Sequence, residues 1–285
     1  MRILLSIFLI IFVSSCSSPE DRIMQDNECV ECDLTEFDFS LVGNLKGTDL
    51  TGATIANTSV GINLEDVILD RAEISMVEFS NSVLKGISFK ETKINSSSFY
   101  GGRIERGEFL DSELKDVTFN DYEIAESNFK DGLLSIIKAD NILFDGSKFN
   151  NISINLDSGE LITFTGGAIE ETTINSQGKR ARISKAQLTN SVMIINHNII
   201  ELDGLNGNKK TLETNATKIK LSNVADLTIK SSAQLVEDLT IIDAKALNIS
   251  PNTFPGELNF TGTNQFGSIS VRKSEIKEIN GFNSS

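Results

Sequence analysis

Residues 79–119 read FSNSVLKGISFKETKINSSSFYGGRIERGEFLDSELKDVTF, with a large apolar residue at every fifth position. The same spacing runs from Leu64 to Ile154, where eighteen of nineteen such positions are Leu, Ile or Phe and Ala139 is the exception. A period of five matches neither the 3.6-residue period of an α-helix nor the two-residue period of a strand. The chain therefore changes direction once every five residues, which indicates a repeat architecture.

The residues around the apolar positions indicate the kind of repeat. Residues 32–39 (CDLTEFDF) and 48–55 (TDLTGATI) follow a pattern of a small residue, an Asp, a Leu or Phe, and then polar residues. This pattern resembles the pentapeptide-repeat proteins, and the resemblance implies a right-handed quadrilateral β-helix with four pentapeptides in each turn. We therefore expect an all-β fold, with a right-handed parallel β-helix over residues 29–155.

A turn of four pentapeptides places residues that are 20 apart on top of one another. This predicts two ladders of aromatic rings on opposite faces of the helix. One ladder contains Phe79, Phe99 and Phe119, and the other contains Phe89, Phe109, Phe129 and Phe149. Ala139 continues the first ladder without a ring, so we expect a weak point there. The position two before each large residue is mostly small, and Tyr122 is the clear misfit.

After residue 155 the period of five disappears, but pairs of apolar residues persist. Ile219 and Leu239 begin two of these pairs and are 20 apart, as are Leu227 and Leu247, whereas Leu247 and Ile269 are 22 apart. Alternating pairs at the spacing of one turn indicate short parallel strands. We therefore expect residues 156–285 to extend the helix as a looser β-solenoid, with a separate β-sandwich as the alternative.

The N-terminus has the features of an export signal. Residues 1–15 contain Arg2 and then an apolar run from Ile3 to Val13, which is too short to span a bilayer. Residues 13–16 (VSSC) resemble the lipobox of bacterial lipoproteins, which implies cleavage before Cys16 and a lipid anchor on Cys16. An ordinary signal peptide is the alternative. Ser17 favours the outer membrane by analogy with enteric sorting, and the polar residues 16–28 read as a tether.

Cys29 and Cys32 form a C-x-x-C pair that invites a metal or redox interpretation. A zinc site needs four ligands, and the single histidine, His197, lies far along the chain. A thioredoxin-like site would need a βαβ context, which the sequence lacks. Because both cysteines fit inward positions of the first turn, we expect a structural role as a buried thiol pair or a local disulfide.

Composition excludes several kinds of chemistry. The net charge is −14, and residues 29–155 carry 22 acidic against 11 basic residues, which disfavours nucleic-acid binding. His197 lies in an Ile-rich stretch and is expected to face solvent on a strand, so a Ser–His–acid triad is not predicted. The absence of Trp disfavours sugar stacking. We expect no catalytic residues, no metal and no cofactor.

These features favour a non-enzymatic, lipid-anchored cell-envelope protein whose rigid rod binds envelope proteins that the sequence does not identify. One alternative follows from the family resemblance, which implies that an acidic rod can mimic DNA and bind a type II topoisomerase. A polysaccharide-binding or polysaccharide-cleaving β-helix is the other alternative. The export signal disfavours DNA mimicry, because it removes the chain from the cytosol.

Overall fold

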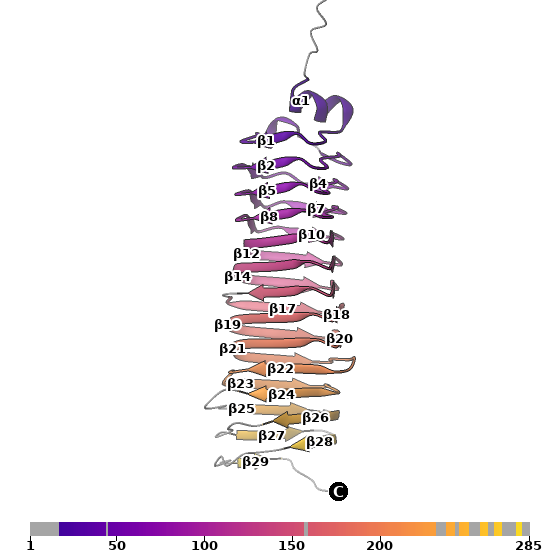
Figure 1. Cartoon of the computed structure of the whole chain (residues 1–285). Coiled ribbons are helices and arrows are strands. Elements are labelled where there is room, and N and C mark those ends of the chain that lie inside the picture. Colours follow the sequence, from indigo (N-terminus) through magenta and orange to yellow (C-terminus); the bar gives the residue numbers. More distant parts are fainter. Residues whose placement is uncertain are drawn as a thin grey trace, which may run out of the picture.

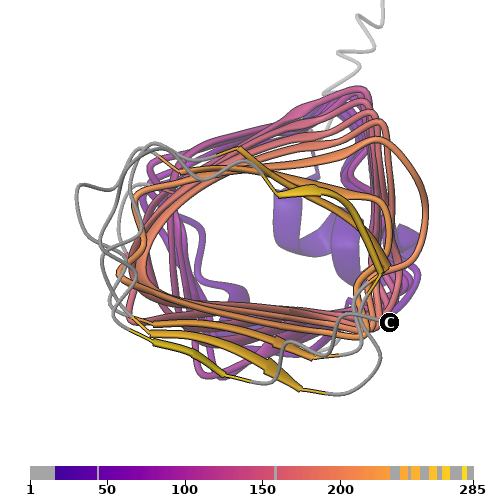
Figure 2. The ribbon, with the colours of Figure 1, turned by 90° about the horizontal axis from the view of Figure 1, so that it is seen from below.

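The computed structural model describes residues 17–43, 45–156 and 159–231, together with residues 238–242, 245–250, 257–261, 265–269 and 278–280. Over these residues the chain winds into a rod of about ten turns whose strands pair in parallel (Figure 1). Seen along the axis, the turns superimpose on a four-sided outline (Figure 2). The fold is a parallel β-solenoid and almost entirely β, which confirms the predicted fold class.

The early turns have four faces, which we number in chain order. Face 1 begins with β3 (Ser59–Val60), β6 (Glu78–Ser80) and β9 (Ser98–Tyr100). Face 2 begins with β4 (Leu64–Glu65), β7 (Val83–Lys85) and β10 (Arg103–Glu105). Face 3 contains β11 (Glu108–Leu110), β13 (Asn128–Lys130), β15 (Lys148–Asn150), β18 (Ala168–Glu170) and β20 (Gln187–Thr189). Face 4 contains β1 (Asp33–Thr35), β2 (Thr54–Ala56), β5 (Glu73–Ser75), β8 (Lys93–Asn95) and β16 (Ser153–Leu156).

Later turns carry faces 4, 1 and 2 on single long strands. These are β12 (Glu113–Ala125), β14 (Leu133–Asp145), β19 (Thr173–Ser184) and β21 (Val192–Asp203). Face 2 also contains β17 (Leu161–Thr165), β23 (Lys218–Ser222), β25 (Asp238–Ile242), β27 (Glu257–Thr261) and β29 (Glu278–Asn280). Face 4 ends with β22 (Lys210–Thr214), β24 (Leu227–Ser231), β26 (Lys245–Ser250) and β28 (Gln265–Ile269).

The corners explain the period of five. From Asp66 to Asp131, every fifth residue has a left-handed backbone with φ between 49° and 66°. Each of these residues stands two positions after an inward apolar residue, so it ends one face and starts the next. The left-handed region is tolerated best by Gly, Asn and Asp, and these corner residues are rich in the three types. The repeat therefore alternates a short strand with one left-handed corner.

One corner is lost in the middle of the rod, in the turn that contains Ala139. The period places a corner between faces 4 and 1 at Ile136 and again at Leu156, but neither has a left-handed φ. A β-branched residue such as Ile136 is disfavoured in that conformation. Instead the strand continues, and Ile136 is buried in the same turn as Ala139, with 0% exposure for both. An extra apolar side chain thus lies in the core of the turn that lacks the ring, and the weak point at Ala139 stays a prediction.

The phenylalanine ladders stack inside the rod on faces 1 and 3. Ring centroids lie 4.7 Å apart for Phe79 and Phe99 and 4.8 Å apart for Phe99 and Phe119, with the rings within 15° of parallel. On face 3 the separations are 4.6, 4.4 and 5.0 Å along Phe89, Phe109, Phe129 and Phe149. These distances match the spacing of neighbouring strands, so the backbone ladder sets the ring stacking.

Tyr122, expected to be a misfit, is accommodated in the core. Its side chain is 2% exposed, and its ring lies 5.5 Å from Phe99 in an edge-to-face contact. The room comes from Gly102 one turn earlier, where an added Cβ would lie 3.0 Å from Tyr122 Cε2. A glycine one turn before a large ring therefore keeps the local packing volume of the core constant. This compensation cannot be seen from the residue at either position alone. Burial raises the pKa of the Tyr122 hydroxyl.

The expected tether is also corrected, because residues 18–28 form a cap. Ser18 caps a short helix, α1 (Pro19–Asp21), and a π-helix, η1 (Arg22–Asp26), follows directly. Ile23 is 3% exposed and belongs to the hydrophobic core, so the segment packs on the first turn (Figure 1). An end cap of this kind protects the apolar interior that the first turn would otherwise expose.

The C-terminal half continues the same solenoid across residue 155. Strand β14 pairs with both β16 and β17, so no break in pairing separates the two halves, and no β-sandwich forms in the described strands. Ile219 lies opposite Leu239 and Ile229 opposite Ile249, as the 20-residue spacing predicts. The proposed 22-residue step is wrong, because Ile249 rather than Leu247 lies opposite Ile269. Among the described residues, no helix is long and apolar enough to cross a membrane.

We predict that Phe109→Ala lowers the free energy of unfolding by about 3–5 kcal/mol, because it removes a ring between Phe89 and Phe129 and leaves a cavity. Glu113→Ala, at an outward position of β12, should change stability by less than about 0.5 kcal/mol. Urea denaturation of both variants checks this, and equal losses for the two would contradict the observed register.

Candidate functional site

The inward positions are filled by the core, so any interaction must use the outward side chains. One face separates charge by sign along the rod. The outward residues of face 2 on β10, β12, β14, β17, β19, β21 and β23 form a continuous surface, which we call the mixed-charge face. Its strands lie in register from β10 to β12 and β14, and on through β17, β19, β21 and β23.

The mixed-charge face is acidic on β12, after β10 and its corner, which present Arg103 and Arg106. Strand β12 and the corner after it present Asp121, Glu123 and Glu126, of which Asp121 and Glu126 are exposed. Asp121 accepts a hydrogen bond of 2.8 Å from Asn141 Nδ2 in the next turn. Glu123 and Glu126 make no ion pair within the described residues. Their carboxylates are therefore available to a partner.

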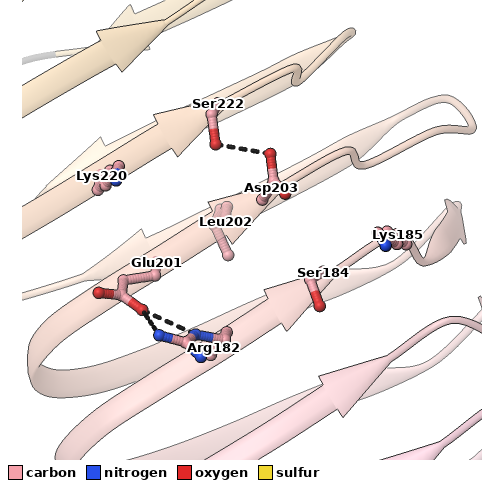
Figure 3. Close-up of a pocket in the computed structure, with 8 residues that line it drawn as sticks. All are labelled: Arg182, Ser184, Lys185, Glu201, Leu202, Asp203, Lys220 and Ser222. Atoms are coloured by element: carbon pink, nitrogen blue, oxygen red, sulfur yellow. Dashed lines mark hydrogen bonds and ion pairs between the residues drawn. The ribbon is translucent and has the colours of Figure 1, made fainter.

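The C-terminal part carries most of the positive charge of this face. Strand β19 and its following corner present Arg180, Arg182 and Lys185, all exposed, and β23 presents Lys220. On the intervening strand, Glu201 accepts from Arg182 Nε at 2.8 Å and from Arg182 Nη2 at 2.6 Å (Figure 3). This ion pair fixes the Arg182 side chain along the face, although exposed pairs of this kind contribute little to stability.

A shallow groove of about 320 Å³ runs across these basic strands. Figure 3 shows Asp203 in its centre, with Lys185 and Lys220 on opposite sides. Asp203 accepts hydrogen bonds from Ser222 Oγ at 2.6 Å and from Asn223 Nδ2 at 3.1 Å. These bonds, together with the two lysines, lower the pKa of the Asp203 carboxyl. Asp203 is thus held within the surface, and the lysines remain at its rim.

The groove has the features of a contact surface. Among the described residues, no group of three His, Cys, Asp or Glu side chains is placed to hold a metal ion. The groove is open and shallow, and its acidic groups are already paired with Arg182, Ser222 and Asn223. What it offers chemically is a pattern of fixed charges that a complementary surface can match.

His197 is not at the surface, which corrects the expectation from sequence. It is 1% exposed, and its Nε2 lies 2.6 Å from Ser176 Oγ. Gly178 stands one turn earlier, where an added Cβ would lie 2.9 Å from His197 Cε1. The inward column of face 1 thus changes from phenylalanine to Ala139, Gly159 and Gly178, and the imidazole fills the space that the glycines leave. Burial lowers the pKa of His197 to about 4.

The Ser176–His197 contact does not form a catalytic triad. His197 Nδ1 is buried without a hydrogen-bond partner, whereas a triad needs an acid at this atom. Both residues are also buried in the rod, where no substrate reaches them. Their arrangement is that of core residues.

The three cysteines fall in two groups. Cys16, the expected lipidation site, lies outside the described residues, as does the expected signal peptide at residues 1–15. Cys29 and Cys32 form a disulfide in the first turn and are buried. Arg22 of the cap donates from Nη1 to Cys32 Sγ at 3.2 Å and from Nη2 to the carbonyl of Val30 at 3.4 Å. The cap and the disulfide therefore pack as one unit.

We predict that acid weakens the fold partly through His197. Its pKa is about 6.5 unfolded and about 4 folded, so the unfolded chain binds the extra proton between these values. Stability should be full above about pH 6.5 and fall by up to about 3 kcal/mol as the pH drops to 4. The stability difference between wild type and His197→Gln, measured by urea denaturation, should change across this window. A constant difference would contradict a buried neutral His197.

No family model matches the sequence, and no curated protein matches it. Among solved structures, the chain is similar to the crystal structure of HetL, a pentapeptide repeat protein involved in heterocyst differentiation regulation from the cyanobacterium Nostoc sp. strain PCC 7120. The sequence identity is 14%, the match covers 64% of this chain and 80% of that chain, and the TM-score is 0.35. The strand pairing of the chain itself establishes the β-solenoid.

Proposed function

We propose that this chain is a non-enzymatic, lipid-anchored protein of the bacterial envelope whose rod acts as a scaffold for protein contacts. The observation that carries the proposal is that inward and outward residues have separate roles in every turn of the rod. The inward positions form one continuous hydrophobic core from Ile23 to Ile241, and the charged groups lie on flat outward faces. A regular solenoid of this kind offers an extended binding surface.

The anchor is proposed from residues 1–16. The apolar run and the lipobox-like VSSC support a lipid on Cys16, shortly before the cap that begins at Ser18. A lipid chain on this residue would attach the capped end of the rod to the membrane, and the outer membrane is the proposed location. The far end of the rod then extends away from the lipid, with its faces open to other envelope proteins.

We predict that Cys16→Ala moves the protein from the membrane pellet to the soluble fraction of cells, because the lipid is its only proposed attachment. Labelling with a radioactive or clickable fatty acid should give a signal for wild type and none for the variant. Cys29→Ser/Cys32→Ser is the matched control and should stay labelled and membrane-bound.

Two results would contradict the proposal. Retention of Cys16→Ala in the pellet would show a different attachment. An unprocessed wild-type chain in the cytosol would remove the envelope location and favour the alternative of a DNA-mimicking rod. Affinity capture of the lipidated wild type from detergent-solubilised envelope then identifies the proteins that the scaffold holds.

A further inference from the structure

We infer that the mixed-charge face binds a second copy of this chain, with the two rods antiparallel and related by a two-fold axis. The axis lies between β14 and β17 and runs along the strand direction. The acidic part of each copy then covers the basic part of the other. This surface is independent of the lipid anchor.

The register of the strands matches the charges position by position. Glu123, Leu143, Thr163 and Arg182 form one column of residues across successive turns. Asp121 and Arg180 stand at the two ends of the neighbouring column, and Glu126 and Lys185 at the two ends of the corner column.

A two-fold axis along the strand direction reverses the order of the turns but keeps each column in place. Asp121 of one copy therefore faces Arg180 of the other, Glu123 faces Arg182, and Glu126 faces Lys185. All three opposed pairs join an acid to a base, and the symmetry repeats them on the other side of the axis. A like-charge arrangement would be repulsive, so this register selects the antiparallel pairing.

The turns next outward from the axis hold one opposed pair of unlike charge and one like-charge pair, Glu105 opposite Asp203, in which Glu105 is paired with Arg103 and Asp203 is hydrogen-bonded within its own chain. Strand β10 then faces β21, which brings Arg103 opposite Glu201 in the same column. The acidic side chains of β12 and its corner enter the groove of Figure 3 from the partner, between Arg182 and Lys185. The groove thereby gains further negative groups beside those of Glu201 and Asp203.

The centre of the face suits close approach. Strands β14 and β17 carry few long charged side chains on this face, and the corners that follow them on face 2 are Gly146 and Gly166. Leu143 and Leu161 are half-buried apolar residues on this central area. An apolar centre with charges around it is the usual arrangement of a protein interface.

The size of the face predicts a weak and salt-dependent dimer. With β7, which pairs with β10 and lies opposite β23 across the axis, the contact spans eight turns, or about 34 Å at the strand spacing, and it is about 16 Å wide, so each copy would bury about 500 Å². The two copies together would bury about 1,000 Å², which lies at the low end for specific interfaces. A two-fold interface is also self-complementary and closed, so it gives a dimer rather than a fibre.

A second copy fits better than another anionic partner because both halves of the match are present in one chain. An anionic polymer would use the basic turns alone and leave Asp121, Glu123 and Glu126 without a role. The net charge of −14 makes two copies repel at long range, but physiological salt screens this over about 8 Å and spares contacts across the interface.

The test uses two full-length copies with different C-terminal affinity tags, co-expressed and purified from a detergent extract of whole cells at about 0.1–0.15 M salt, so that it does not depend on where the protein is located. Wild-type copies should co-purify, with at least a tenfold loss at 1 M salt. Arg180→Glu/Lys185→Glu on both copies should abolish co-purification, and so should Asp121→Lys/Glu126→Lys on both copies. One copy of each variant should associate again, because every reversed pair then meets its opposite.

The control is Lys90→Glu/Lys148→Glu on face 3, which changes the charge as much as the first variant and should co-purify like wild type. Restored binding in the mixed pair also shows that both variants fold. Failure of wild-type copies to co-purify would overturn the inference. Failure of the mixed pair to co-purify would also overturn it. So would loss of co-purification with Arg180→Glu/Lys185→Glu but not with the variant of the acidic residues, which would assign the basic residues to a different anionic partner.

Discussion

The parallel backbone ladder places residues of successive turns directly above one another, about 4.8 Å apart, and the rest of the structure depends on this constraint. Any inward residue must fit against the residue 17 to 21 positions before and after it. Flat rings satisfy this by stacking, as along Phe89, Phe109, Phe129 and Phe149. A ring that does not lie flat needs a glycine beside it.

Two buried polar side chains show how the constraint works. Tyr122 is placed over Gly102, and His197 over Gly178, so in each case the added volume in one turn is matched by its absence in the preceding turn. Packing is conserved per column rather than per position. The buried hydroxyl of Tyr122 and Nδ1 of His197 lack hydrogen-bond partners, so these two columns carry an energetic cost that the purely apolar columns avoid.

The same ladder organises the outer surface. Side chains that are far apart in the sequence become columns, and the sign of charge along a column can be compared from turn to turn. On face 2 the acidic residues of β12 and the basic residues of β19 occupy the same three columns. This arrangement connects the fold to the proposed scaffold role, since recognition rests on a fixed pattern of charges and not on a mobile loop or an enclosed pocket.

Much of the fold could be read from the sequence because the period of five is a local property. The inward residues from Leu64 to Ile154 follow from spacing alone. The phenylalanine ladders and the parallel pairing of Ile219 with Leu239 follow from that spacing together with the turn of four pentapeptides that the family resemblance implies. The cap at Ser18 to Glu28 was missed because its composition is polar, and only Ile23 reaches the core. The mixed-charge face was missed because charges summed along the sequence hide their positions on a face.

The sequence by itself determined where the chain turns and which side chains point inward, since each corner needs only a local backbone conformation and each apolar residue must leave water. The tertiary structure decided what those side chains meet. Ile136 points into the core where a corner is lost, and His197 lies inside the rod in the space above Gly178. Such choices depend on the neighbouring turns, about 20 residues away, so they appear only when the turns are stacked.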